Sequence, residues 1–73
     1  MLDFSSRLRG LRVQKNLTQK AVADFLETYE KSYQRYEHGE RKPSYEMLIK
    51  LANCFDVSTD YLLGLTDKPE RNV

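Results

Sequence analysis

Apolar residues recur at helical spacing near the start of the chain. Phe4, Leu8 and Leu11 fall on one face of residues 4–15, and basic residues occupy several of the positions between them. This pattern predicts an amphipathic helix with one buried stripe. Asn16 suits the end of that helix, because asparagine tolerates the left-handed conformation that closes many helices.

A second helix is predicted over residues 19–26. Thr18 stands where an N-cap belongs, and its hydroxyl can accept a free backbone N–H. Gln19 lies in the first turn with its side chain free to point outward. The predicted inward face consists of Val22, Ala23 and Leu26.

A short turn at residues 27–29 leads to a third predicted helix over residues 30–38. Tyr33 and Tyr36 lie three apart on one face. We assign both to the core rather than to base stacking, because aromatic residues at helical spacing usually pack inside and keep their hydroxyls near a partner. Gly39 ends the helix, since glycine enters a left-handed C-cap without a Cβ penalty.

Two further helices are predicted after Pro43, which bars a helical continuation through the charged loop before it. Ser44 caps the fourth helix, and Ser58 caps a short fifth helix that Gly64 closes. The apolar stripe of the fourth helix consists of Leu48, Ile49, Leu51, Ala52 and Phe55. With no strand pattern, the sequence predicts a compact all-α domain of five helices over residues 1–66. The polar residues 67–73 are expected to fray.

Composition limits the size and location of the protein. With 73 residues and 40% hydrophobic residues, the chain is expected to form one packed domain with a thin stability margin. Cys54 is the only cysteine, so no intramolecular disulfide forms and an ordinary half-buried thiol in a reducing compartment is expected. No segment has the pattern of a signal peptide or of a membrane-spanning helix. These features predict a soluble cytoplasmic protein.

Charge is unevenly distributed along the chain, although the formal net charge is only +1. Residues 1–42 carry nine Lys and Arg against six acids, which gives +3, and residues 43–73 carry three against five, which gives −2. The asymmetry would direct the first half of the chain toward a polyanion.

The second and third predicted helices follow the helix-turn-helix plan. They are separated by about three residues, and the later helix has an apolar inner face and a polar outer face. A helix of this width fits the major groove of DNA, where each base pair shows its own pattern of donors and acceptors.

At this point the sequence resembles the phage-repressor (Cro/Xre-type) helix-turn-helix DNA-binding family over nearly its whole length. The matching segments are Leu17-Thr18-Gln19, Val22-Ala23 with Leu26, Arg35-Tyr36-Glu37-His38-Gly39, Arg41-Lys42-Pro43-Ser44, Leu48 with Lys50-Leu51-Ala52, and Val57-Ser58 with Asp60-Tyr61-Leu62-Leu63-Gly64. The resemblance implies a transcriptional regulator, a repressor, that binds a palindromic double-stranded operator as a homodimer, at least on DNA.

The resemblance also implies which residues contact DNA. The base-reading positions are Glu30, Lys31, Gln34 and Arg35. The phosphate-contacting positions are Gln19, Thr28, Tyr29, Ser32, His38, Arg41 and Lys42.

The side chains at the predicted base-reading positions are of types that hydrogen-bond to base edges in the major groove. Arginine and lysine pair with guanine O6 and N7, glutamine with adenine, and glutamate accepts from cytosine N4. Arg35 is the strongest candidate, while Lys31 and Gln34 have an ordinary solvated-surface interpretation as an alternative. Glu30 repels phosphates, so it either reads cytosine or pairs with a basic neighbour such as Lys31.

The turn departs from the family pattern. The family commonly has glycine where this chain has Glu27, so a left-handed backbone there is strained or the turn takes another shape. Tyr29 occupies the capping position and is a poor cap, and capping by Thr28 instead would start the helix one residue earlier. For Glu37 the resemblance implies a structural alternative, in which it pairs with an arginine of the first helix, Arg12 or Arg9, and holds the third helix rather than reading DNA.

Other functions have weaker support in the sequence. There is no nucleophile–His–acid arrangement and no glycine-rich phosphate loop, so no enzyme, small-molecule substrate or cofactor is expected. His38 has no ligand cluster around it, which argues against a metal site. The rival function is a protein-interaction module of antitoxin or antirepressor type. The apolar cluster at residues 61–65 is either core or an exposed dimerisation patch.

Overall fold

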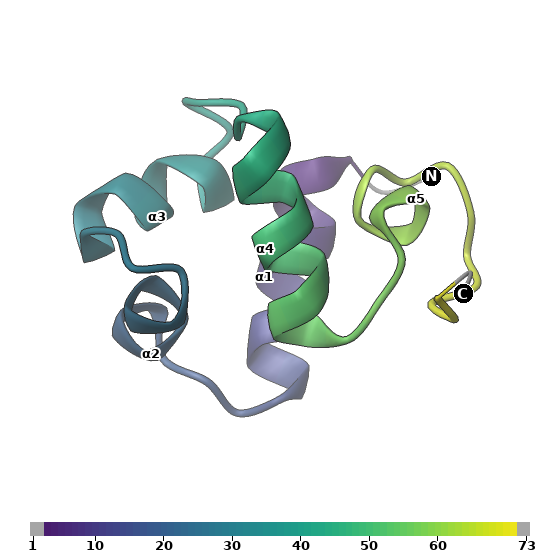
Figure 1. Cartoon of the computed structure of the whole chain (residues 1–73), viewed down its shortest axis with the longest axis horizontal. Helices are drawn as coiled ribbons and strands as arrows, with labels where there is room; N and C mark the ends of the chain where they lie inside the picture. The colour runs from purple at the N-terminus through teal and green to yellow at the C-terminus, as the bar shows by residue number, and fades with distance from the viewer. Residues whose placement is uncertain (1–2, 72–73) are drawn as a thin grey trace.

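The computed structural model describes residues 3–71 and contains five helices in that range (Figure 1). They are α1 (Phe4–Gln14), α2 (Gln19–Phe25), α3 (Glu30–Glu37), α4 (Tyr45–Phe55) and α5 (Thr59–Leu62). No strand occurs between residues 3 and 71, and the predicted all-α fold is confirmed. Within the same residues, none of the helices has the length and hydropathy needed to cross a bilayer.

Side-chain caps start four of the five helices. Thr18, Ser44 and Ser58 accept from backbone N–H groups at 3.0, 3.1 and 3.0 Å, as their positions predicted. Asp3 caps α1 in the same way through the Ser6 amide at 2.9 Å. The exception is α3, whose N-cap is Tyr29 and makes no side-chain capping bond.

A left-handed residue follows the end of every helix. Asn16 (φ 57°), Gly39 (φ 73°) and Gly64 (φ 78°) were expected there from the sequence. Glu27 (φ 58°) and Asp56 (φ 54°) adopt the same conformation without the conformational freedom of glycine. Because each such residue reverses the chain within one turn, the connections stay short.

The core draws on all five helices. It consists of Leu8, Leu11, Val22, Ala23, Leu26, Tyr33, Tyr36, Leu51, Ala52, Phe55, Val57 and Leu62. The predicted inward face of α2 and the core placement of Tyr33 and Tyr36 are confirmed. The predicted apolar stripe of α4 is wrong for one residue, Ile49, which is exposed and is not part of this core.

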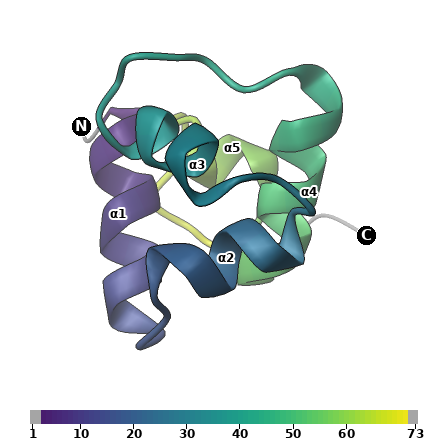
Figure 2. The ribbon, with the colours of Figure 1, turned by 90° about the vertical axis from the view of Figure 1, so that its left-hand side faces the viewer.

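The arrangement divides the molecule into two sides. Helices α2 and α3 lie together on one side, with α1 and α4 flanking them when that side is viewed directly (Figure 2). Helix α5 and the C-terminal segment occupy the opposite side (Figure 1). The surface of α2 and α3 is therefore presented away from the C-terminal segment.

Residues 67–71 of the segment expected to fray make contacts with the helices, and residues 72 and 73 lie outside the described residues. The Ser58 amide donates to the Pro69 carbonyl at 3.1 Å, and an Arg71 Nη donates to Asn53 Oδ1 at 2.6 Å. Arg7 of α1 holds the start of the segment through Asp67 at 3.3 Å. The residues of the segment itself are exposed from 67 to 71, and fraying stays a prediction.

Arg7 is a feature that sequence periodicity missed. The pattern of the first helix placed Arg7 between its apolar positions and outside its buried stripe, but the guanidinium is buried over the Tyr61 ring, 4.1 Å from the centroid. It also donates to the Thr66 carbonyl at 3.3 Å. The burial arises because α5 and residue 66 fold back on α1, a long-range contact that local periodicity does not encode.

Candidate nucleic-acid interface

The turn between α2 and α3 is closed by two backbone hydrogen bonds. The Glu27 amide donates to the Asp24 carbonyl at 3.1 Å, and the Thr28 amide donates to the Ala23 carbonyl at 3.0 Å. These two hydrogen bonds together form a Schellman motif, which requires a left-handed residue, here Glu27. Of the two turn shapes left open by the sequence, the strained left-handed one is adopted.

Helix α3 begins at Glu30, with Tyr29 as its N-cap. The alternative that Thr28 caps the helix and starts it one residue earlier is therefore wrong. Because the start is fixed, the predicted base-reading positions keep their places on the helix.

Three of the four predicted base-reading residues lie on an exposed face of α3. Glu30, Lys31 and Arg35 are all exposed. The ion pairs found within residues 3–71 involve none of them, so Glu30 is not neutralised by Lys31. These side chains form a free polar surface, which we call the α3 outer face.

The predicted phosphate-contacting residues border this face. Tyr29, His38, Arg41 and Lys42 are exposed, the last two on the loop that runs from α3 to α4 (Figure 2). Thr28 and Ser32 are half-buried, as is Gln19 at the start of α2. The set therefore includes both ends of α3 and the first turn of α2.

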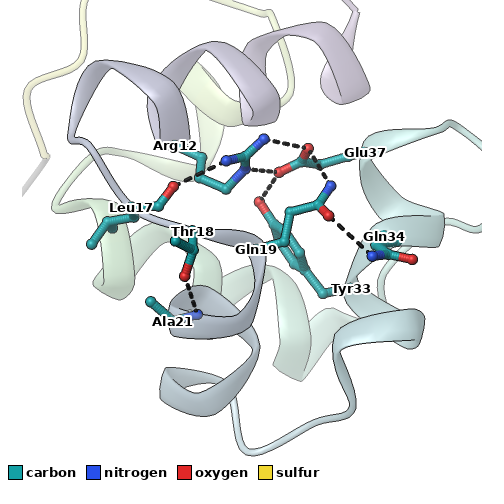
Figure 3. A network of polar contacts seen from close by, with 8 residues as sticks. All are labelled: Arg12, Leu17, Thr18, Gln19, Ala21, Tyr33, Gln34 and Glu37. Carbon is teal, nitrogen blue, oxygen red and sulfur yellow. Dashed lines mark hydrogen bonds and ion pairs between the residues drawn. The ribbon is translucent and has the colours of Figure 1, made fainter.

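A buried ion pair holds α3 against α1. Glu37, whose side chain is completely buried, accepts from Arg12 Nε at 2.5 Å and from Arg12 Nη2 at 3.2 Å (Figure 3). Arg12 also donates to the Leu17 carbonyl at 3.0 Å. Of the two partners proposed from the sequence, Arg12 and not Arg9 is the one that binds Glu37.

Two more donors complete the shell of the Glu37 carboxylate. The Tyr33 hydroxyl donates to Oε2 at 2.5 Å, and Gln19 Nε2 donates to Oε1 at 3.2 Å. Burial alone would raise the pKa of Glu37, but the hydrogen bonds from Arg12, Tyr33 and Gln19 together hold that pKa below its ordinary value. Burial and the neighbouring carboxylate raise the pKa of Tyr33. The carboxylate is thus ionised and the phenol protonated at neutral pH.

Gln34, the fourth predicted base-reading residue, is joined to this network. Its Nε2 donates to Gln19 Oε1 at 3.0 Å (Figure 3). Gln34 and Gln19 were assigned to bases and phosphates separately, yet the structure links the two amides. The link connects residues fifteen positions apart on different helices, and the sequence carries no signal for it.

The comparison with protein families places these helices in a known group. The Helix-turn-helix model (HTH_3) matches residues 8–62, which covers α2, the turn and α3 entirely. The chain belongs to the helix-turn-helix family. This membership confirms the resemblance found in the sequence.

Relatives of this helix-turn-helix protein are named as transcriptional regulators. It is 41% identical over 70 residues to the uncharacterized HTH-type transcriptional regulator YobD of Bacillus subtilis, covering 96% of this chain and 62% of YobD. It is 36% identical over 63 residues to the cryptic phage CTXphi transcriptional repressor RstR of Vibrio cholerae, covering 86% and 56%. The chain spans between 52% and 62% of the length of YobD and two other relatives from Bacillus subtilis.

Solved structures share the fold of this helix-turn-helix protein. The P22 c2 repressor in complex with a synthetic operator matches with a TM-score of 0.82 and 25% identity over 86% of this chain and 96% of that one. The restriction-modification controller protein C.AhdI of Aeromonas hydrophila matches with a TM-score of 0.76 and 32% identity, covering 81% and 89%. The five-helix arrangement is therefore shared by regulatory proteins.

Proposed function

We propose that this protein is a sequence-specific transcriptional regulator, a repressor, that binds double-stranded DNA in the cytoplasm. The observation that carries the proposal is the α3 outer face, where Glu30, Lys31 and Arg35 are exposed and have no ion-pair partner within residues 3–71. The Arg12–Glu37 pair holds this face in a fixed position on α1. The P22 c2 repressor, which shares the fold, was solved with an operator.

In this proposal α3 enters the major groove and its outer face reads base edges. Arg35 pairs with guanine O6 and N7, and Lys31 offers a second donor to guanine. Glu30 accepts from cytosine N4, since it lacks an internal cation. Gln34 reaches a base from its place beside Gln19.

The residues that border the α3 outer face are proposed to bind the DNA backbone. The proposed phosphate contacts are Gln19, Thr28, Tyr29, Ser32, His38, Arg41 and Lys42. Their hydroxyl, amide, imidazole and cationic groups are the types that bind phosphate oxygens in protein–DNA complexes. Residues 1–66 form the proposed DNA-binding domain, with residues 67–73 as an appended tail.

The protein is proposed to act as a homodimer, at least on DNA, on a palindromic operator. An exposed apolar patch supports this: Tyr45 is 80% exposed, and with Ile49 and Leu63 it lines a shallow hollow between α4 and α5. Such patches mark interaction surfaces. In this proposal the two copies bind half-sites about 34 Å apart, the spacing of one helical turn of DNA.

Selection of bound sequences from a random duplex library tests the proposal. We expect an enriched inverted repeat whose affinity falls steeply between two salt concentrations, because each neutralised phosphate contributes about 0.9 to the slope of log affinity against log salt. Weak binding with no enriched sequence would contradict it and would favour a protein-interaction module of antitoxin or antirepressor type.

A further inference from the structure

The hydrogen-bond chain from Glu37 to Gln34 has a fixed direction. An ionised carboxylate only accepts hydrogen bonds, so the Gln19 amide must turn its Nε2 toward Glu37 Oε1, 3.2 Å away. Its carbonyl oxygen then faces α3. The orientation of the Gln19 amide is thus set by a carboxylate that is itself buried and held by Arg12 and Tyr33.

The same logic sets the orientation of the next amide. Gln19 Oε1 only accepts, so Gln34 must turn its Nε2 toward it, at 3.0 Å. Gln34 Oε1 is left pointing away from Gln19 (Figure 3). No hydrogen bond to this oxygen is made by the residues from 3 to 71, and the Gln34 side chain is only half-buried.

We propose that Glu37 is a positioning residue for base recognition: through Gln19 it fixes the Gln34 amide so that the carbonyl oxygen of Gln34 accepts from the exocyclic amino group of a base. This inference rests on the proposed DNA-binding function and adds to it a preference for particular bases at the position that Gln34 contacts. In the major groove those amino groups belong to adenine N6 and cytosine N4, whereas guanine and thymine present only acceptors and a methyl group there.

Reversal of either amide is opposed by the network. Turning Gln34 around brings its oxygen against Gln19 Oε1, and turning Gln19 around brings its oxygen against the Glu37 carboxylate. Each reversal exchanges a hydrogen bond for a contact between two acceptors. A glutamine without such a network rotates freely and accepts or donates equally well.

The test measures base preference at one position. The position read by Gln34 is located as the one where Gln34→Ala loses discrimination in competition with the four possible base pairs. There the wild-type protein is expected to prefer adenine or cytosine on the contacted strand by about tenfold over guanine or thymine. The two favoured bases are distinguished by comparing the A·T and C·G duplexes directly.

Gln19→Ala is the decisive variant, because it keeps Gln34 and removes what orients it. The preference at this position should fall to roughly twofold, since one neutral hydrogen bond then no longer selects between amide orientations, while the preference at the Arg35 position stays unchanged. Gln14→Ala removes an exposed glutamine of α1 outside the network and serves as the control. Glu37→Gln should repeat the Gln19→Ala result where the variant folds.

A measurement without DNA separates this inference from the proposed function. In the free protein, the side-chain amide resonances of Gln19 and Gln34 should be shifted from those of Gln14, and Gln34→Ala should move the Gln19 pair. Resonances like those of Gln14 would overturn the inference. An unchanged base preference in Gln19→Ala, or a wild-type preference for guanine or thymine, would overturn it while DNA binding stands. The absence of any preferred duplex would overturn both.

Discussion

Arg7 and Arg12 lie five residues apart on α1 and are both mostly buried, but their acidic partners differ completely in environment. Arg12, 16% exposed, pairs with Glu37, whose side chain is 0% exposed. Arg7, 6% exposed, pairs with Asp67, whose side chain is 95% exposed. The Arg7 Nε has no hydrogen-bond partner among the described residues. Arg12 therefore neutralises the buried carboxylate of Glu37. Arg7, in contrast, places its own charge in a buried site while its carboxylate partner stays in solvent.

Replacing the two arginines by methionine should therefore have different effects. Arg12→Met leaves the Glu37 carboxylate buried without its cation, and we expect a loss of about 3–5 kcal/mol in the free energy of unfolding. Arg7→Met removes a buried charge and keeps apolar contact with Tyr61, so we expect a change within about 1 kcal/mol of zero. Urea denaturation measures both, with Arg9→Met as the exposed control. Equal losses in the two variants would contradict the distinction.

Stability should depend on Glu37 in acid. Because folding lowers the pKa of Glu37, its contribution is fully present above the ordinary value of 4.5 and is lost as the pH falls below it through the folded-state pKa. Denaturation followed from pH 6 to pH 3 should show this loss, and Glu37→Gln should reduce it. Asp3, whose pKa is lowered by its hydrogen bond to the Ser6 amide, leaves a residual slope. An unchanged slope in Glu37→Gln would rule out this role.

Glu27→Gly should stabilise the protein. A left-handed conformation costs a non-glycine residue about 1–2 kcal/mol, of which part is offset by the extra freedom glycine gains in the unfolded chain. We therefore expect a gain of roughly 0.5–1 kcal/mol in thermal or urea unfolding. Asn16→Gly is the matched control, with a smaller gain because asparagine tolerates this conformation. A loss of stability at Glu27 would show that its side chain makes a compensating contact.

Arg35 and Lys42 should affect DNA binding in different ways. Arg35→Ala is expected to relax sequence preference at one base position per half-site, at a cost of about 1–3 kcal/mol on the cognate duplex. Lys42→Ala should weaken cognate and random duplexes alike and reduce the salt slope by about one per monomer. Equal losses on both duplexes for Arg35→Ala would reassign Arg35 to a phosphate.

The C-terminal segment should open more readily than the helices. Its ion pairs, Arg7–Asp67 and Arg71–Asp56, each involve a largely exposed carboxylate, and such pairs contribute little. The Ser58 amide, which donates to Pro69, should therefore exchange its hydrogen much faster than the Leu62 amide within α5. Similar protection at both amides would show that the segment stays docked.

Local signals were sufficient for most of the fold. Thr18, Ser44 and Ser58 cap helices because their hydroxyls sit immediately before apolar periodic segments, and that information is contained in a few consecutive residues. Glu27 was identified as an anomaly only through the family pattern. Asp56 was not predicted to be left-handed, although aspartate enters that conformation more readily than most residues other than glycine.

Long-range contacts explain what the sequence did not reveal. The exposed positions of the α3 outer face followed from helical spacing and the family pattern. The link between Gln34 and Gln19 did not, because it depends on how α2 and α3 pack and on a carboxylate supplied three residues further along α3. The burial of Arg7 depends in the same way on the return of residues 61–67 to α1.

The missing side-chain cap on α3 has a consequence for binding. Four helices have an N–H group of their first turn bound by Asp3, Thr18, Ser44 or Ser58, whereas Tyr29 makes no side-chain capping bond at the start of α3. A side-chain cap contributes about 1 kcal/mol. The helix proposed to read DNA is thus the one without a side-chain cap, so its position for binding depends on its contacts with α1 and α2.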